Sequence, residues 1–217
     1  MKILLIAGHG AGDPGAVGNG YKEAELTREV VKLLKPQLDN YADVTIADTS
    51  KNWFNNKMDF SPYHYVLEIH YNAGVNDTKG NNGTTGTEIY ITTSEKTHGV
   101  ETEIVKGISS IGFKNRGVKR KNWSVINRAK SQGVSSALLE VCFIDDADDM
   151  WLYQKKKTEV IKAIANGIIK GFGLEAKTTN DVAIIKSKIG LADETIKYLQ
   201  DYKFGAELIR KIANAVK

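Results

Sequence analysis

The chain has 217 residues, of which 41% are hydrophobic and 26% charged, proportions that exclude extended disorder and a fibrous repeat. Thirty basic and 26 acidic residues give a net charge of +4, which suits contact with an anionic polymer but falls short of a nucleic-acid-binding surface. The single cysteine, Cys142, excludes an intramolecular disulfide, so any metal site would depend on histidine and carboxylate ligands.

The apolar run near the start of the chain, residues 3–7, is too short for a signal peptide or a membrane span. We therefore expect a soluble protein that is made in the cytoplasm and does not insert into a membrane. A function outside the membrane would require release by another protein.

The first predicted element is a buried strand over residues 2–7, followed by the glycine-rich loop 8–15. Apolar residues at intervals of three and four then predict a helix over 23–38. The later elements follow the same two patterns. Strands are predicted over 44–47, 65–70, 87–92 and 136–143, and helices over 96–111 and 155–172.

Alternating strands and helices predict an α/β fold, with a mostly parallel twisted sheet flanked by helices on both faces. The polar segment 177–180 predicts a domain boundary, giving a main domain over residues 1–176. Residues 177–217 should form three short helices, and they carry eight basic and five acidic groups, a charge of +3. A module this small rarely folds on core burial alone, so it should dock, self-associate or bind a target.

Reactive side chains gather at one predicted edge of the sheet. His9 follows the first strand, His70 ends another, Glu140 lies near the end of a third, and Glu23 opens the first helix. Ligands bind at the carboxyl ends of strands in open parallel sheets. Two imidazoles with one carboxylate are a ligand set of catalytic zinc, and a further carboxylate nearby provides proton transfer. Ordinary polar or core histidines would give the same spacing.

Three sequence blocks add to this pattern, namely GHGAGDPGAVGNGYKEAEL (8–26), EIHYNAG (68–74) and ALLEVCFIDDADD (137–149). Together they resemble the signature blocks of zinc-dependent N-acetylmuramoyl-L-alanine amidases, particularly those of bacteriophage endolysins. The resemblance spans residues 1 to about 175 and implies the same mostly parallel sheet.

By position, the resemblance implies His9, Glu23 and His70 as zinc ligands and Glu140 as the catalytic acid and base. Asn72 matches the asparagine of the middle block and is expected to line the substrate groove. Two further glutamates need separate consideration. Glu25 is an alternative ligand if the helix begins later, and Glu68 is a supporting partner of His70, a local variation or a direct ligand.

The resemblance implies a cell-wall lytic enzyme that cleaves the amide between N-acetylmuramic acid and L-alanine of peptidoglycan with zinc-activated water. It would accumulate in the host cytoplasm and act on the wall after release. Alternatives are a zinc peptidase cutting within the stem peptide and a non-catalytic wall-binding protein of the same fold. Residues 177–217 would then target the wall, promote homo-oligomerisation, or both.

Two other features are less specific. Cys142 lies in an apolar run and is expected to be a buried hydrophobic residue rather than a nucleophile. Five basic residues between Lys114 and Lys121 form either a solvated face or a contact with anionic wall polymer. The loop 8–20 lacks the Gly-Lys-Ser/Thr ending of a phosphate-binding loop, so we do not expect a bound nucleotide. The modest net charge leads us to expect no nucleic acid as a partner.

Overall fold

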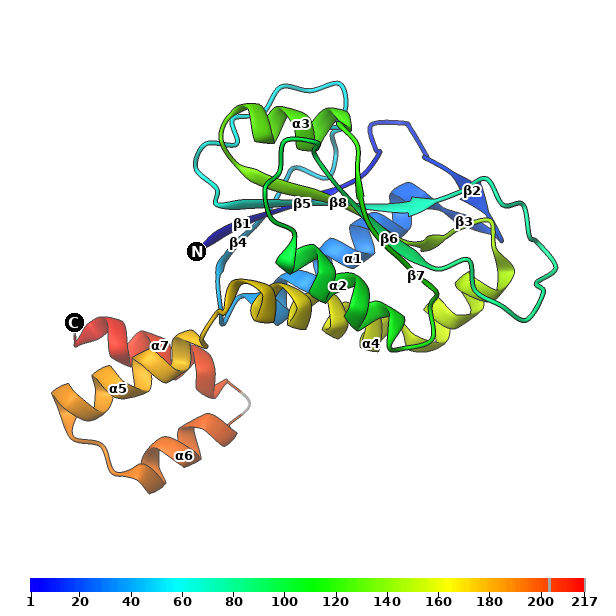
Figure 1. The fold of residues 1–217 in the computed structure, drawn as a ribbon. Coiled ribbons are helices and arrows are strands. Elements are labelled where there is room, and N and C mark those ends of the chain that lie inside the picture. Colours follow the sequence, from blue (N-terminus) through cyan, green and yellow to red (C-terminus); the bar gives the residue numbers. More distant parts are fainter. Residues whose placement is uncertain (203, 217) are drawn as a thin grey trace. The chain divides into compact units, whose positions relative to one another are not determined.

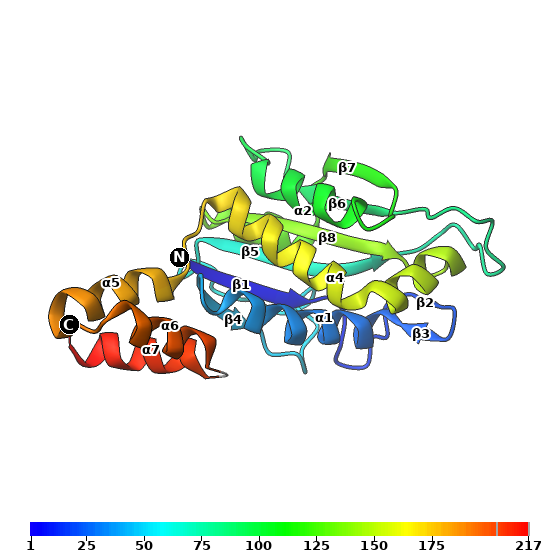
Figure 2. The same cartoon turned by 90° about the horizontal axis from the view of Figure 1, so that it is seen from below.

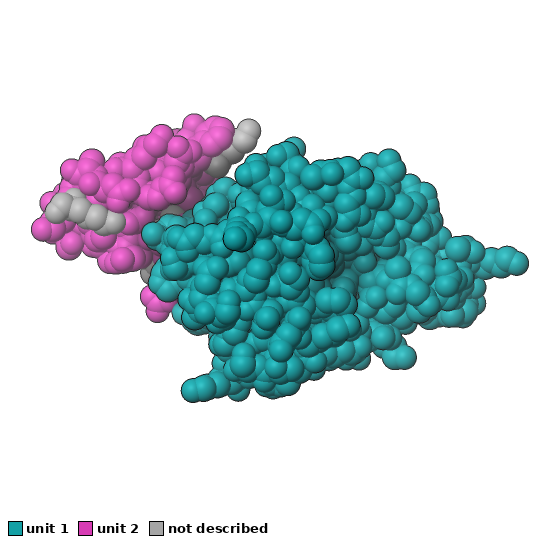
Figure 3. Space-filling model, turned by 90° about the horizontal axis from the view of Figure 1, so that it is seen from above, with its two compact units in different colours: residues 1–39, 43–173 teal, residues 40–42, 174–217 magenta. Residues whose placement is uncertain are grey.

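The structure is a computed structural model that describes residues 1–202 and 204–216, without the side chains of 178 and 179. Two cations counted in the predicted C-terminal module, Lys203 and Lys217, therefore lie outside the described residues. The chain divides into two compact units, one of residues 1–39 and 43–173 and the other of residues 40–42 and 174–217 (Figure 3). Each unit is described by itself.

The first unit is built on a six-stranded sheet with the order β4-β1-β5-β8-β6-β7 (Figure 1). Its strands are β1 (Lys2–Ala7), β4 (Asp43–Ile46), β5 (Tyr65–Asn72), β6 (Thr87–Ile91), β7 (Asn115–Arg120) and β8 (Ser135–Phe143). The strands β4, β1, β5 and β8 are parallel, whereas β6 pairs antiparallel with β8 and parallel with β7. The short strands β2 (Val17–Gly18) and β3 (Tyr21–Lys22) form a separate hairpin.

Helices cover both faces of this sheet, which confirms the predicted α/β fold. One face carries α1 (Glu23–Leu38), α2 (Gly99–Ser109) and α4 (Ala147–Phe172), as Figure 2 shows. The opposite face carries α3 (Ser124–Ser131), which packs on β8 and β5. Both β1 and β5 are buried on both sides. β1 has the continuous apolar sequence typical of a central parallel strand, whereas β5 also contains Glu68 and His70.

Four elements of the first unit, namely β2, β3, β7 and α3, have no counterpart among the predicted ones. The strands β2 and β3 have only two residues each. β7 has the sequence NRGVKR and is only half-buried, so it lacks an apolar run. The helix α3 has eight residues, too few for a clear period. In addition, α4 begins at Ala147 because the Asp146 side chain accepts hydrogen bonds from the backbone N–H groups of Asp148 and Asp149, a side-chain cap that stabilises a helix start.

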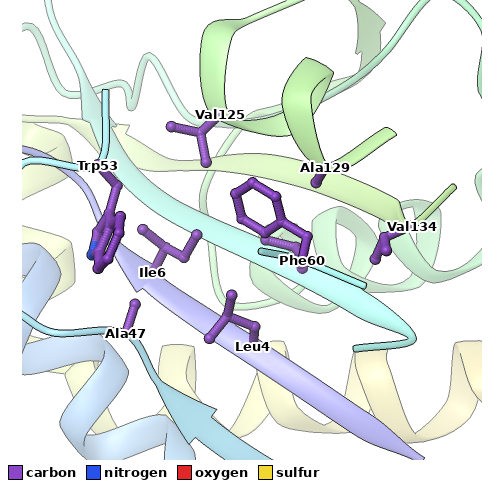
Figure 4. Packing of buried hydrophobic residues seen from close by; sticks show 9 residues of the cluster. Leu4, Ile6, Ala47, Trp53, Phe60, Val125, Ala129 and Val134 are labelled. Carbon is purple, nitrogen blue, oxygen red and sulfur yellow. The ribbon is translucent and has the colours of Figure 1, made fainter. Parts of the chain in front are cut away.

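The core beneath α3 fixes which side chains reach the site. Leu4 and Ile6 of β1 pack with Phe60 and with Val125 and Ala129 of α3 (Figure 4). Val66 of β5 belongs to the same cluster. Because side chains alternate along a strand, Glu68, His70 and Asn72 of β5 lie on the face of α3, away from the large helical layer.

The second unit consists of α5 (Lys177–Ile189), α6 (Asp193–Asp201) and α7 (Gly205–Ala215). Its described core contains Ile185, Ile209 and Ala213, with partly buried apolar neighbours. The helix α5 ends at Gly190, whose positive φ of 72° closes the helix in the way that glycine favours. Among the described residues, no helix has the length and apolar character needed to cross a membrane.

Candidate metal centre and substrate cavity

Three ionisable side chains from distant segments meet at the carboxyl ends of β1 and β5. His9 follows β1, His70 lies near the end of β5, and Glu23 is the first residue of α1. One ligand atom from each lies within 4.8 Å of the others, and these residues form the one group in the described part of the chain that is suited to a metal ion. Glu23 links the histidines, since its Oε1 lies 2.8 Å from Nδ1 of His70 and its Oε2 3.0 Å from Nε2 of His9.

Local sequence explains this close approach. A Cβ at Gly8 would lie 2.4 Å from the His70 ring, and a Cβ at Gly15 would lie 2.6 Å from the His9 ring. Gly15 also has a φ of +66°, a conformation that glycine adopts without strain. The loop after β1 therefore needs glycines for the rings to pack at 4.9 Å between centroids.

The second ring nitrogen of each histidine, which does not face Glu23, also has a carboxylate partner. Nδ1 of His9 lies 2.8 Å from Asp13, and Nε2 of His70 lies 3.3 Å from the buried carboxylate of Glu68. Each imidazole thus has one nitrogen toward Glu23 and the other toward a second carboxylate. Such outer carboxylates fix the tautomer and orientation of metal-binding histidines.

The ionisation of Glu23 and the protonation of the two histidines depend on each other. Burial opposes the ionisation of Glu23, but hydrogen bonds from His70 and His9 outweigh it and lower the pKa of Glu23. Burial lowers the pKa of the His70 imidazole, and its hydrogen bonds to Glu23 and Glu68 outweigh that effect, so the pKa is raised well above its usual value. The histidines therefore favour the ionised form of Glu23, and Glu23 in turn favours the protonated form of the histidines.

Glu140 lies beside this centre because β8 is the neighbour of β5, and His70 and Glu140 are register partners. Burial raises the pKa of Glu140 to about 7, and the nearby carboxylates of Glu23, Glu88 and Glu68 add to the shift. Among the described residues, Oε2 of Glu140 is buried without a hydrogen-bond partner. A carboxyl group that titrates near neutrality is suited to accepting and donating a proton.

These side chains line one cavity of about 510 Å³, which could hold a ligand. Its lining includes His9, Glu23, His70, Glu140 and Asn72, so the cavity gathers all five residues singled out in the sequence. Phe54 and Trp123 also line it, and Phe54 is exposed. The neighbouring Trp53 does not line the cavity but packs in the hydrophobic core beneath α3.

The remaining sequence candidates have simpler surroundings. The Glu25 side chain is 71% exposed and pairs with Lys22, so Glu23 rather than Glu25 lies between the histidines. Cys142 is fully buried, and burial raises the pKa of its thiol well above the usual value. Within the basic run, Arg116 and Lys119 pair with the buried Glu88, a residue without any local sequence signal.

Comparison with known proteins gives the family. The family model described as N-acetylmuramoyl-L-alanine amidase matches residues 3–170. The chain belongs to the N-acetylmuramoyl-L-alanine amidase family. The amidase is 30% identical over 211 residues to the sporulation-specific N-acetylmuramoyl-L-alanine amidase of Bacillus subtilis, covering 88% of this chain and 74% of that protein. It is 27% identical to the endolysin of Bacillus phage SPP1, covering 81% and 68% of the two chains.

Solved structures show the same fold. The catalytic domain of CwlV, an amidase from Bacillus (Paenibacillus) polymyxa, matches with a TM-score of 0.63 at 21% identity, over 80% of this chain and 99% of that one. The catalytic domain of the CD27L endolysin matches with a TM-score of 0.61 at 22% identity, over 78% and 97%. These structures show the fold, whereas the family model and the 30% identical Bacillus subtilis amidase confirm the predicted family. The protein is a peptidoglycan hydrolase by family membership.

Proposed function

We propose that the amidase uses zinc to hydrolyse the amide between the lactyl group of N-acetylmuramic acid and L-alanine of the stem peptide. The observation that carries this proposal is the placement of His9, Glu23 and His70 within 4.8 Å of one another in one cavity with Glu140. Zinc is the metal of choice because two imidazoles and one carboxylate form an open three-ligand site.

The residues present fit such an ion. Glu23 is 3% exposed, and a carboxylate so deeply buried needs compensating positive charge. Its two oxygens face one nitrogen of each histidine, while backbone N–H groups of Ala16 and Tyr71 hold the same oxygens from behind. The candidate ligand atoms thus lie within 4.8 Å of one another, and the backbone holds the Glu23 carboxylate in place, as expected for a preformed metal site.

In this proposal His9, Glu23 and His70 hold the zinc ion. When bound, zinc lowers the pKa of a water molecule and polarises the scissile carbonyl. Glu140 takes the proton of the attacking water on its unpartnered Oε2 and passes it to the leaving amine of L-alanine. Asn72 binds the substrate in the groove, where Phe54 and Trp123 supply apolar surface. The positioned acid and base contributes about 10² to 10⁴ in rate.

Product identification tests the proposal. Purified sacculi are digested with the full chain, with and without a chelator and with zinc added back, and the soluble fragments are identified by mass spectrometry. We expect zinc-dependent release of intact stem peptides from a glycan whose muramic acid lacks peptide. Fragments cut within the stem peptide would instead identify a zinc peptidase, and binding without cleavage would identify a wall-binding protein.

An endolysin role remains part of the proposal. Its support is the similarity to the endolysin of Bacillus phage SPP1, although a bacterial sporulation amidase is similar as well. In an endolysin role the protein accumulates in the host cytoplasm and reaches the wall after release. Expression in the cytoplasm with and without a co-expressed membrane-permeabilising protein tests this, because only the co-expressing culture should lyse.

A further inference from the structure

Glu88 of β6 is a charged side chain that the chemistry above does not use. Its side chain is 1% exposed, and it is the register partner of Glu140 across the antiparallel pair β6–β8. Directly opposed residues of a sheet lie on the same face. Glu88 therefore lies on the site face of the sheet, one strand beyond Glu140.

Both oxygens of Glu88 accept hydrogen bonds. Oε1 accepts from Nδ2 of Asn72 at 2.9 Å and from the hydroxyl of Tyr90 at 2.8 Å. Oε2 accepts from Nε of Arg116 and Nζ of Lys119. One carboxylate thus connects a residue of the substrate cavity with two cations of β7. A buried carboxylate with two cations and two neutral donors is fully satisfied, so it holds these groups in fixed positions.

The orientation of the Asn72 amide depends on this contact. Its Oδ1 accepts the backbone N–H of Ala73 at 2.8 Å, while Nδ2 donates to Glu88. Turning the amide over would place a donor against the N–H of Ala73 and an oxygen against a carboxylate. The amide group is thus held at both ends, and one proton on Nδ2 remains for an acceptor oxygen in the cavity that Asn72 lines.

We propose that Glu88 is a positioning residue that orients Asn72 so that its remaining amide proton binds a carbonyl or hydroxyl oxygen of the glycan-peptide substrate. The proposal rests on the proposed function for the identity of the substrate. It assigns to Glu88 an effect on substrate binding through Asn72, separate from the contribution of its charge to the raised pKa of Glu140.

Glu88→Gln is the sharpest test because it keeps shape and removes one acceptor. The glutamine oxygen should face Arg116 and Lys119, because hydrogen bonds from cations are stronger than those from neutral donors. Its NH₂ group then faces Nδ2 of Asn72, donor against donor. We expect a three- to tenfold rise in KM for a soluble disaccharide-peptide, about the value of one neutral hydrogen bond. Because loss of the Glu88 charge lowers the pKa of Glu140, kcat is compared with each enzyme at its own pH optimum, where it should be unchanged.

One matched variant controls this test. Glu95 is a buried glutamate that contacts Lys130 of α3 and Ser135 at the start of β8. Glu95→Gln therefore makes the same chemical change away from the cavity and should leave KM unchanged. A KM increase in Glu95→Gln as large as in Glu88→Gln would overturn the proposal.

A double-mutant cycle shows whether Glu88 acts through Asn72. We expect Glu88→Gln to add nothing to the KM effect of Asn72→Ala, because the oriented group is already absent. Additive effects, or a loss of kcat with KM unchanged, would contradict the positioning role. Binding of the disaccharide-peptide to the Glu140→Ala background gives the same comparison without turnover.

A spectroscopic measurement separates this inference from the proposed function. In nitrogen-15 NMR spectra, the Asn72 side-chain amide should shift in Glu88→Gln and stay unchanged in Glu95→Gln. An unshifted signal overturns the positioning role even if the enzyme cleaves its amide. A shifted signal in a protein that cleaves no wall supports the orientation of Asn72 and removes only the proposed substrate.

Discussion

At the scale of single residues, the buried carboxylates carry different tasks because their partners differ. Glu23 is ionised between two histidines, whereas Glu140 has a raised pKa and an unpartnered oxygen. Glu88 is held by two cations, and burial is outweighed by these contacts, so its pKa is lowered. Environment therefore distinguishes three carboxylates of the same chemistry, which we propose to be a metal ligand (Glu23), a proton carrier (Glu140) and a positioning residue (Glu88).

Glu140→Ala removes the group proposed to move the proton. We expect kcat to fall by about 10² to 10⁴, the usual value of a positioned acid and base, with zinc content unchanged because Glu140 is outside the group of three ligands. Kinetics on a soluble disaccharide-peptide and metal analysis of the same preparation check this. Full activity in the variant would refute the assigned role.

Glu68→Ala tests the outer support of His70. Loss of the carboxylate that lies 3.3 Å from Nε2 of His70 leaves this nitrogen without its partner. We expect zinc affinity to fall by about 10- to 100-fold, as for other outer-sphere partners of metal ligands. Competition with a chromophoric chelator measures it, and Glu25→Ala, which changes an exposed carboxylate, is the control. Equal zinc affinity in the Glu68→Ala and Glu25→Ala variants would contradict the role of Glu68 as a partner of His70.

Asp149 gives the protein a pH dependence away from the metal centre. Burial raises its pKa to about 6, although it accepts hydrogen bonds from Phe143 and Gly86. An aspartate with a raised folded-state pKa stabilises the fold below its unfolded pKa of about 3.9, and this stability is lost as the pH rises to about 6.

The prediction for Asp149→Asn follows from this direction. The variant and the wild type should have similar free energies of unfolding near pH 4. By pH 7 the variant should be more stable by up to about 3 kcal/mol, the value of a two-unit pKa shift. Urea denaturation across this range measures the difference. A difference that is constant with pH, or that shrinks toward pH 7, would contradict the assignment.

At the scale of elements, α2 and α4 pack closely through glycine. A Cβ at Gly167 of α4 would lie 2.6 Å from the Cα of Ile104 in α2. Alanine favours a helix over glycine by about 1 kcal/mol, whereas overpacking a tight interface costs about 1–3 kcal/mol. The close backbone contact decides between these effects, because a backbone atom cannot move aside as a side chain can.

We therefore expect Gly167→Ala to destabilise the protein by up to about 2 kcal/mol, the excess of the overpacking cost over the gain in helix propensity. Gly99 of α2 has nothing within 4 Å of an added Cβ, so Gly99→Ala is the matched control and should be neutral or slightly stabilising. Thermal or urea unfolding compares the two variants. A stabilised Gly167→Ala variant would show that the helices can separate at no cost.

At the scale of the whole molecule, every residue of the proposed site belongs to the first compact unit. The boundary of the catalytic domain at residue 176 and the role of residues 177–217 stay predictions. Residues 177–217 carry a charge of +3. This charge favours contact with an anionic wall polymer as the role of the module.

Deletion of residues 177–217 should leave cleavage of a soluble disaccharide-peptide within about twofold, as expected for a domain with its own core. Binding to whole cell walls should weaken, and the wall binding of the full chain should fall with added salt. Sedimentation of labelled protein with walls measures both. Unchanged wall binding with an altered sedimentation coefficient would instead identify the module as a self-association element.

The sequence by itself determined the parts of the protein that depend on local pattern. Apolar runs predicted the central strands, because a strand that is buried on both faces is apolar throughout. Helical periods predicted the long helices, because burial of one face leaves apolar residues at intervals of three and four. The three blocks around His9, His70 and Glu140 predicted the family, which the family model confirms. The ligand set and the role of Asn72 remain predictions, supported by their common cavity.

Tertiary structure decided the contacts that no local pattern indicates. The place of Glu23 rather than Glu25 between the histidines depends on the exact start of α1, and the contacts of Glu88 with Asn72, Arg116 and Lys119 depend on strand order and register. β7 and α3 lack a clear period because one is a half-buried edge strand and the other is short. The period of apolar residues in a segment indicates which of its faces is buried. Contacts between distant segments depend on strand order and register, which cannot be predicted from any one segment.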